Sequence, residues 1–282
     1  MTPGRRWRLR TRSLPLERPL IMGVVNLTPD SFSDGGTISS PQEGLAHARR
    51  LIEEGADLLD LGGESTRPGA EAVSAEVEIE RVMPVLEALV ADGTPLSIDT
   101  SKPEVARVAL AAGAEAVNDV TSGSHREMFP VVADAGAGLI LMHMHGNPRT
   151  MQTEPRYADV VAEIKTFLAE RAAAAQKQGV TPDRIALDPG IGFGKTLEHN
   201  LTLIRNLRAF RILGFPVVLG ASRKKFLGLI TGVDDPAQRD LASAVIAALG
   251  VERGANILRV HNVAACREAV AVAIAIVPES GG

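Results

Sequence analysis

Residues 95–120 read PLSIDTSKPEVARVALAAGAEAVNDV and contain a complete strand–helix–strand unit. The apolar run at 95–100 predicts a first strand, and the run at 115–120 predicts a second. Between them, 103–112 has a helical pattern that starts at a proline and is followed by Gly113, which suits the left-handed end of a helix. Two strands joined in this way predict a parallel sheet with helices packed on it.

The same alternation extends over the whole chain. Eight strands are expected, at 20–26, 58–62, 95–100, 115–120, 138–144, 184–190, 215–222 and 256–262. The helical patterns cover 46–54, 74–91, 103–112, 126–135, 158–178, 197–207, 238–253 and 263–276. The chain has 282 residues, close to the length of about 250 typical of one eight-stranded barrel. We therefore predict an α/β protein with a single (β/α)8 TIM barrel over 19–282, preceded by an N-terminal extension at 1–18 that packs on the barrel.

Nearly every predicted strand ends in a polar residue able to do chemistry. These residues are Asn26, Asp60 with Glu64, Asp99, Asn118 with Asp119, His143, Asp188, Ser222 with Lys224, and Arg259 with His261. A closed barrel collects the carboxyl ends of all its strands on one rim, where such enzymes hold their active sites. An open doubly wound sheet is the alternative fold, and it would place its ligand groups at one switch point instead. We expect the active site on the barrel rim.

Alternation along the strands predicts which of these side chains face the barrel interior. Asp99, Asp188 and Arg259 each lie opposite apolar neighbours, which must face the helices. A buried carboxylate without compensation is costly, so both acids should meet a hydrogen-bonding ligand or a basic neighbour. A buried structural ion pair is the alternative interpretation. With Asn118 at the adjoining strand end, the two acids favour a flat, nitrogen-rich heterocycle as the ligand.

The ends of the last two predicted strands carry the opposite charge. They hold Ser222, Arg223, Lys224, Arg259, His261 and Asn262. Barrels frequently bind phosphate on the loops after strands seven and eight, so this cluster predicts an anionic substrate group. The alternative is a solvated surface cluster, because the adjacent Lys225 indicates that part of the charge is exposed.

Composition limits the partners. The formal net charge is −4 and aromatic residues make up 3%, so we expect no nucleic-acid partner. No apolar stretch reaches the roughly 18 residues of a membrane span, and we expect no membrane association. The only cysteine, Cys266, cannot form a disulfide within the chain, which favours a reducing, cytoplasmic setting. Near the N-terminus, Trp7 and Leu9 alternate with arginines, which predicts a strand or hairpin across the bottom of the barrel.

Two motifs fail on inspection, and two loops stand out. DPGIGFGKT at 188–196 resembles a phosphate-binding P-loop but has the wrong glycine spacing. His143 and His145 have the spacing of a metal pair, yet both should point toward the helices if Met142 faces the interior, so no metal cluster is expected there. The long segments LTPDSFSDGGTISSPQE and GESTRPGAEAVS follow the first two strands and are expected to act as lids.

Several long blocks resemble, in order and spacing, those of the dihydropteroate synthases, the pterin-binding enzymes of folate biosynthesis that sulfonamides target. The blocks are MGVVNLTPDSFSDGG, DLGGESTRPGA, SIDTSKPEVA, AVNDV, LMHMHGNPRTMQ, LDPGIGFGK, GASRKKFLG and RVHN. The resemblance covers 19–276. It implies a transferase that condenses 7,8-dihydropterin-6-ylmethyl diphosphate with 4-aminobenzoate to dihydropteroate and pyrophosphate. It also implies a need for Mg²⁺ and a homodimer formed through the last helices.

The resemblance further assigns roles to individual residues. The pterin is assigned to Asp99, Asn118, Met142, Asp188, Gly220, Lys224 and Arg259, and the aminobenzoate to Thr66, Arg67, Pro68, Phe193 and Ser222. The diphosphate is assigned to Asn26, Arg259 and His261, and Mg²⁺ to Asn26. Catalysis is assigned to Asp99, Asp188, Lys224, Arg259 and His261. The chain departs from the family pattern at Asn262, where Asp usually follows RVH, and at His145, where Gln is usual.

Two other functions remain open at this point. Folate-dependent methyltransferases share the pterin-binding barrel, although they have no use for a diphosphate site, and Lys224, Arg259 and the TPDSFSDGG segment argue against them. A pterin-binding paralogue without catalysis is the second alternative. The predicted rim holds no Ser-His-Asp or Cys-His constellation, and the implied reaction needs none, because loss of diphosphate leaves a cation that the pterin ring stabilises.

Overall fold

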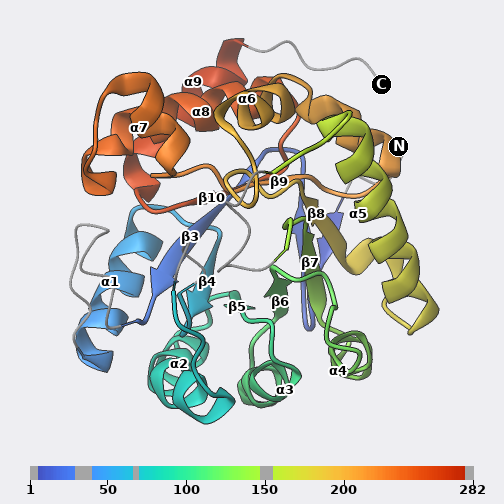
Figure 1. Ribbon diagram of the computed structural model, residues 1–282. Coiled ribbons are helices and arrows are strands. Elements are labelled where there is room, and N and C mark those ends of the chain that lie inside the picture. The colour runs from blue at the N-terminus through green and yellow to red at the C-terminus, as the bar shows by residue number, and fades with distance from the viewer. Residues whose placement is uncertain (1–5, 29–39, 66–69, 147–154, 277–282) are drawn as a thin grey trace.

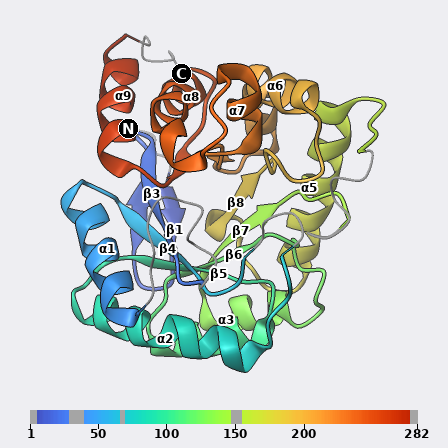
Figure 2. The same ribbon diagram turned by 60° about the vertical axis from the view of Figure 1, so that its left-hand side comes forward.

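A computed structural model describes residues 6–28, 40–65, 70–146 and 155–276. Its parallel strands form a central barrel that the helices surround (Figure 1; Figure 2). The strands are β1 (Arg6–Arg8), β2 (Ser13–Pro15), β3 (Leu20–Asn26), β4 (Leu58–Gly62), β5 (Leu96–Asp99), β6 (Ala116–Asp119), β7 (Gly138–Met142), β8 (Ile185–Asp188), β9 (Val218–Leu219) and β10 (Ile257–Val260). The α-helices are α1 (Pro41–Glu53), α2 (Ala75–Ala91), α3 (Pro103–Ala112), α4 (Met128–Ala135), α5 (Val160–Lys177), α6 (Leu197–Arg205), α7 (Lys225–Thr231), α8 (Asp240–Glu252) and α9 (Val263–Ile276). Short 3-10 helices are η2 (Pro182–Arg184), η3 (Leu207–Leu213) and η4 (Pro236–Arg239).

The sheet closes on itself. Its strands follow the order β8-β7-β6-β5-β4-β3-β10-β9, and every neighbouring pair is parallel. A parallel bridge between Leu187 and Val217 joins the two ends, and the Leu187 amide donates to the Pro216 carbonyl at 2.8 Å. The prediction of a (β/α)8 barrel is confirmed. The alternative fold, an open doubly wound sheet, is excluded because the sheet is closed.

The predicted alternation of side chains along the strands is also confirmed. Leu96, Ile98 and Leu258 belong to the large apolar core between the strands and the helices. Met22 and Ile140 belong to a second, smaller core inside the barrel. Since side chains alternate along a strand, the residues two positions beyond the inner set point into the barrel as well, at its carboxyl rim.

The N-terminal segment closes the opposite end of the barrel, as predicted. Strands β1 and β2 pair as an antiparallel hairpin. Trp7 and Leu9 are buried in the inner core, and the Trp7 indole Nε1 donates to the Arg184 carbonyl at 2.8 Å, just before β8. A filled bottom leaves the carboxyl rim as the end of the barrel where polar side chains gather.

Three elements differ from the prediction. Helix α1 begins earlier than expected, because the Ser40 side chain accepts the Glu43 amide and Pro41 occupies the first helical position. The predicted strand at 215–222 is regular only over Val218–Leu219, since Pro216 has no amide hydrogen to donate to a ladder. Helix α7 was not expected. None of the helices in the described part of the chain is long and apolar enough to cross a membrane.

Candidate active site

Arg259 lies at the centre of the charged groups on the rim. From β10 its Nε donates to Asp60 Oδ2 of β4 at 2.6 Å, and its Nη2 donates to Asp99 Oδ2 of β5 at 2.8 Å. Burial alone would lower the pKa of Arg259, but the charges of Asp60 and Asp99 outweigh it and raise the pKa. The guanidinium is therefore a fixed cation held between two carboxylates.

Asp60 is a site residue that the sequence reasoning did not select. It is fully buried, and its Oδ2 also accepts a hydrogen bond from Asn118 Nδ2 at 2.8 Å. It was noted only as a polar strand end, although Leu58, two positions earlier, lies in the inner core and indicates the inward phase. Asp60 links the predicted pterin residue Asn118 to Arg259.

Two carboxylate oxygens in this group have no partner. Asp60 Oδ1 and Asp99 Oδ1 are buried and accept no hydrogen bond within the described residues. Burial raises the pKa of Asp99 to about 7, although Arg259 acts in the opposite direction. Buried polar atoms without partners are uncommon in folded proteins, so these oxygens indicate a ligand that donates hydrogen bonds.

Asp188 lies on the same rim as Arg259. At the end of β8 its Oδ1 accepts the Gly190 amide at 2.7 Å, and burial raises its pKa. Met142, at the end of β7, is its cross-strand neighbour. A Cβ placed on Gly220 would lie 3.5 Å from Asp188 Oδ2 and 3.8 Å from Arg259 Cβ. Gly220 thus separates the acid from the base by the width of one small residue, as the rim hypothesis requires.

Lys224 lies against the loop that follows β8. Its Nζ donates to the Ile191 carbonyl and stands 3.9 Å from the centroid of the Phe193 ring. A Cβ on Gly192 would approach Lys224 Cδ to 2.7 Å, which explains the glycine. Burial lowers the pKa of Lys224 to about 7, although Asp188 acts in the opposite direction. The cation is therefore poorly solvated and close to Asp188.

Ser222 and His261 are in direct contact. The His261 amide donates to Ser222 Oγ at 3.2 Å, and Nδ1 of the same histidine lies 3.0 Å from that hydroxyl. The resemblance assigned Ser222 to the aminobenzoate and His261 to the diphosphate. Their contact makes the two predicted subsites neighbours.

Two residues of the predicted basic cluster bind the same acidic side chain. Arg223 forms two hydrogen bonds to Asp240 of α8, at 2.6 and 2.8 Å. Asn262 also donates to Asp240, at 2.9 Å. Both side chains therefore pair with Asp240 on α8, and their membership of the anion-binding cluster stays a prediction.

Other polar strand ends support loops. Asp119 accepts hydrogen bonds from the amides of Thr121 and Gly123. Glu64 forms an ion pair with Lys102 at 2.9 Å. The polar strand ends therefore divide between an inner group and a group that shapes the loops.

His143 faces the helices, as its predicted phase requires. Its ring lies 4.9 Å from that of Phe167 on α5, and its Nδ1 lies 3.0 Å from Lys195 Nζ. Burial and the neighbouring Lys195 lower the pKa of His143 to about 3, and burial lowers that of Lys195 well below its usual value. His145 lies against Tyr157. Within the described residues, no group of three or more His, Cys, Asp or Glu side chains is placed to hold a metal ion.

Asn26 is the predicted metal ligand and lies on the rim. Asn26 ends β3 beside Gly62 of β4, and a Cβ on Gly62 would lie 3.8 Å from both Asn26 Oδ1 and Asp99 Oδ2. The amide oxygen of Asn26 is therefore next to the acid group. Three predicted aminobenzoate residues, Thr66, Arg67 and Pro68, lie outside the described residues.

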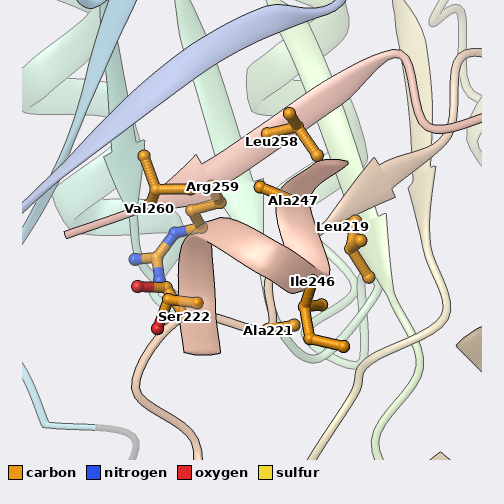
Figure 3. A pocket seen from close by; sticks show the side chains of 9 residues that line it. Leu219, Ala221, Ser222, Ile246, Ala247, Leu258, Arg259 and Val260 are labelled. Atoms are coloured by element: carbon orange, nitrogen blue, oxygen red, sulfur yellow. The ribbon is translucent and has the colours of Figure 1, made fainter. Parts of the chain in front are cut away.

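A small pocket lies behind the rim, between the strands and α8 (Figure 3). Apolar side chains such as Leu219, Ile246 and Leu258 line most of it, together with Ser222 and Arg259. The predicted pterin residues Asp99, Asn118 and Asp188 are not among its lining residues. The pocket therefore lies beside Ser222 and Arg259, and the three predicted pterin residues do not line it.

Comparisons with known proteins identify the family of the chain. The family model described as "Pterin binding enzyme" matches residues 22–261. A dihydropteroate synthase from Neisseria meningitidis serogroup C is 47% identical over 268 residues, which cover 94% of this chain and 95% of that protein.

Two solved structures of dihydropteroate synthase from Xanthomonas albilineans are similar over nearly the whole chain. The one with 4-aminobenzoic acid has a TM-score of 0.90 and 48% identity, and covers 98% of this chain and 100% of its own. The one in complex with 7,8-dihydropteroate has a TM-score of 0.85 and 46% identity, and covers 96% and 100%. With its rim of acids around Arg259 and relatives of nearly half identity along its length, the chain belongs to the pterin-binding enzymes, among the dihydropteroate synthases.

Proposed function

We propose that this rim condenses 7,8-dihydropterin-6-ylmethyl diphosphate with 4-aminobenzoate to form 7,8-dihydropteroate and pyrophosphate. The observation that carries the proposal is the approach of Asp188 and Arg259 across Gly220, with unpartnered carboxylate oxygens beside them. The related enzyme has been solved with 4-aminobenzoic acid and with 7,8-dihydropteroate, which supports the same substrates here. The folate-dependent methyltransferase alternative has no comparable support.

The acids would bind the pterin. Asp188 keeps Oδ2 for a ligand, since Oδ1 accepts the Gly190 amide. Asp99 offers Oδ1, which is buried without a partner. Asn118 would read the adjoining edge of the ring, with Met142 and Gly220 lining the pocket. Hydrogen bonds to carboxylates are stronger than neutral ones, and they suit a ring with several N–H donors.

Arg259 and His261 would bind the diphosphate. Arg259 uses Nε and Nη2 for Asp60 and Asp99, so its Nη1 is the nitrogen that we expect to donate to the phosphate oxygens. His261, at the end of the same strand, would donate beside it. As the carbon–oxygen bond to the diphosphate breaks, both groups would stabilise the departing anion, while Asp99 and Asp188 would stabilise the cation on the pterin.

Aminobenzoate would then supply the new bond. Its amine is neutral near pH 7, so its lone pair can attack the methylene carbon directly, and the amine proton then leaves to solvent or to pyrophosphate. Phe193 and Ser222 would flank it, with Thr66, Arg67 and Pro68 closing the site. No protein nucleophile takes part.

We propose Asn26 as the protein ligand of Mg²⁺. Its amide oxygen is a hard donor of the type that Mg²⁺ accepts, and Mg²⁺ commonly takes further ligands from substrate phosphates. Asn26 Oδ1 also lies at the end of β3 next to the acid group, where a bound diphosphate would be within reach. When bound, the ion would neutralise charge on the diphosphate.

We also propose a cytoplasmic homodimer. Exposed apolar residues gather on the last helices, and Leu241, Val245 and Leu249 of α8 follow one another at intervals of four residues on one face. Leu229 of α7 and Val272 of α9 are exposed too. A double substitution, Leu241→Glu with Val245→Glu, should convert the dimer to a monomer in light scattering. An unchanged mass would place the interface elsewhere.

The function is tested by the release of pyrophosphate. We expect release to depend on both substrates and on Mg²⁺, and dihydropteroate to appear in equal amount. Binding of the pterin diphosphate without any turnover would instead identify the non-catalytic paralogue. Pyrophosphate release that does not need aminobenzoate would contradict the proposed condensation.

A further inference from the structure

The chain makes a tight turn between β9 and α7 that carries two proposed substrate-binding residues. Arg223, in the middle of this turn, has a φ of 58°, a left-handed conformation that residues with a side chain seldom adopt. Ser222 on one side contacts His261, and Lys224 on the other contacts the Phe193 ring. The backbone at Arg223 therefore sets the directions of both neighbours.

Arg223 is held at three points by the segment that begins α8. Its amide donates to Ser243 Oγ at 2.9 Å, and its carbonyl accepts from Arg239 Nη1 at 3.0 Å. Its guanidinium forms the two bonds to Asp240. Ser243 Oγ in turn donates to the Arg239 carbonyl at 2.7 Å, and both of these residues are buried. The unusual backbone conformation is thus supported through its N–H, its C=O and its side chain.

Asn262 completes this arrangement from the start of α9. Its Oδ1 accepts the Ala265 amide at 3.0 Å, which caps the helix, and its Nδ2 donates to Asp240 Oδ2 at 2.9 Å. An aspartate at 262 could still cap α9, but it would turn a carboxylate oxygen toward that of Asp240. Two like charges at that separation repel strongly. The aspartate usual in the family at this position is therefore disfavoured beside an ionised Asp240.

We infer that Asp240 is a positioning residue for the aminobenzoate side of the active site, acting through Arg223, and that Asn262 is the neutral partner that this role requires. In this chain the carboxylate that supports the turn is Asp240 of α8. The residue after RVH is Asn262, whose neutral side chain can donate to that carboxylate. The inference rests on the aminobenzoate role proposed above for Ser222.

The ionisation of Asp240 agrees with the inference. Burial would raise its pKa, but the hydrogen bonds from Arg223 and Asn262 outweigh burial and lower it. The group is therefore a carboxylate at neutral pH. Its pair with Arg223 is half-buried, with both side chains at most 23% exposed, so solvent screens it less than an open surface pair.

The test is a charge exchange between the two positions. Asp240→Asn, Asn262→Asp and the double variant are compared with the unmodified enzyme, using kcat, the KM of each substrate and Tm. Asp92→Asn is the matched control, because Asp92 forms a similar two-bond pair with Arg49 on the exposed side of the barrel. We expect each single variant at 240 or 262 to lower kcat/KM for aminobenzoate about tenfold.

In the double variant, kcat/KM for aminobenzoate should recover to within about threefold of the unmodified enzyme, because one carboxylate is again present beside Arg223. In the single variants the KM of aminobenzoate should rise through Ser222. The KM of the pterin diphosphate should rise less, because Lys224 is only one of its proposed partners and Asp99, Asn118 and Asp188 lie on other strands. Single variants within twofold of the unmodified enzyme would overturn the inference. A double variant whose kcat/KM is no higher than that of the less active single variant would also overturn it. Equal increases in KM for both substrates, together with a lower Tm, would do the same. Activity of the unmodified enzyme tests the proposed function separately.

Discussion

Gly220→Ala tests whether the pterin lies between the acid and the base of the rim. The new methyl group would stand 3.5 Å from Asp188 Oδ2 and 3.8 Å from Arg259 Cβ, both ordinary van der Waals distances. Gly220 is not among the glycines with positive φ, so alanine fits the backbone. The fold should therefore tolerate the change, and the free energy of unfolding should rise by about 0.4–1 kcal/mol because the unfolded chain loses conformational freedom.

The substitution should nevertheless weaken binding of the pterin diphosphate. Asp188 Oδ1 is occupied by the Gly190 amide, so Oδ2 is the oxygen available to a ligand, and the methyl group would cover it. Losing a hydrogen bond to a charged group costs about 1.5–3 kcal/mol, which corresponds to roughly tenfold to hundredfold in kcat/KM. Steady-state kinetics should show this loss in the KM of pterin diphosphate, with little change for aminobenzoate and no fall in Tm. A pterin KM within twofold of the unmodified enzyme would refute the placement.

Three further substitutions test the proposed site. Asp188→Ala should lower kcat/KM by about tenfold to a hundredfold, because it removes a charge-assisted pair, and unchanged steady-state kinetics would remove Asp188 from the site. Arg67→Ala should raise the KM of aminobenzoate far more than that of pterin diphosphate, whereas equal increases would indicate a collapsed lid. Asp99 has a folded pKa of about 7, above its usual 3.8, so the folded state binds more protons between these values and stability falls as pH rises through that window. Asp99→Asn removes this contribution. Between pH 5 and pH 7 the free energy of unfolding of the variant, measured in urea, should therefore fall by roughly 2 kcal/mol less than that of the unmodified enzyme. The same pH dependence of unfolding free energy in both proteins would contradict the raised pKa.

The barrel and the inward residues of its strands could be predicted from local pattern. Alternation placed Asp99, Asp188 and Arg259 inside the barrel, because the opposite faces of their strands are apolar and must meet helices. The same rule turned His143 outward, and its contact with Phe167 on α5 agrees. These predictions succeeded because each depends on neighbours within a few residues along the chain.

Pairings between distant residues could not be predicted in the same way. Asp60 joins Arg259, 199 positions away, and Asn118, 58 positions away, and neither link leaves a mark in the local pattern. Arg223 follows a strand end just as Lys224 does, yet its guanidinium pairs with Asp240 on α8, a link that the local pattern does not indicate. A residue's type and strand position indicate that it can act at a rim, but the helices behind the rim decide whether it does.

The charged groups of the rim explain how such a site would stabilise the transition state more than the bound substrates. Asp60, Asp99 and Asp188 face two cations, Arg259 and Lys224, in a place where burial raises the pKa of Asp99 and lowers that of Lys224. In the free site, burial therefore disfavours the charged forms of Asp99 and Lys224. A pterin that becomes cationic would meet the acids, and a diphosphate that leaves would meet Arg259 and His261. Because these groups are already fixed by the barrel, they need not reorient as the charges separate, and their stabilisation is greatest at the transition state.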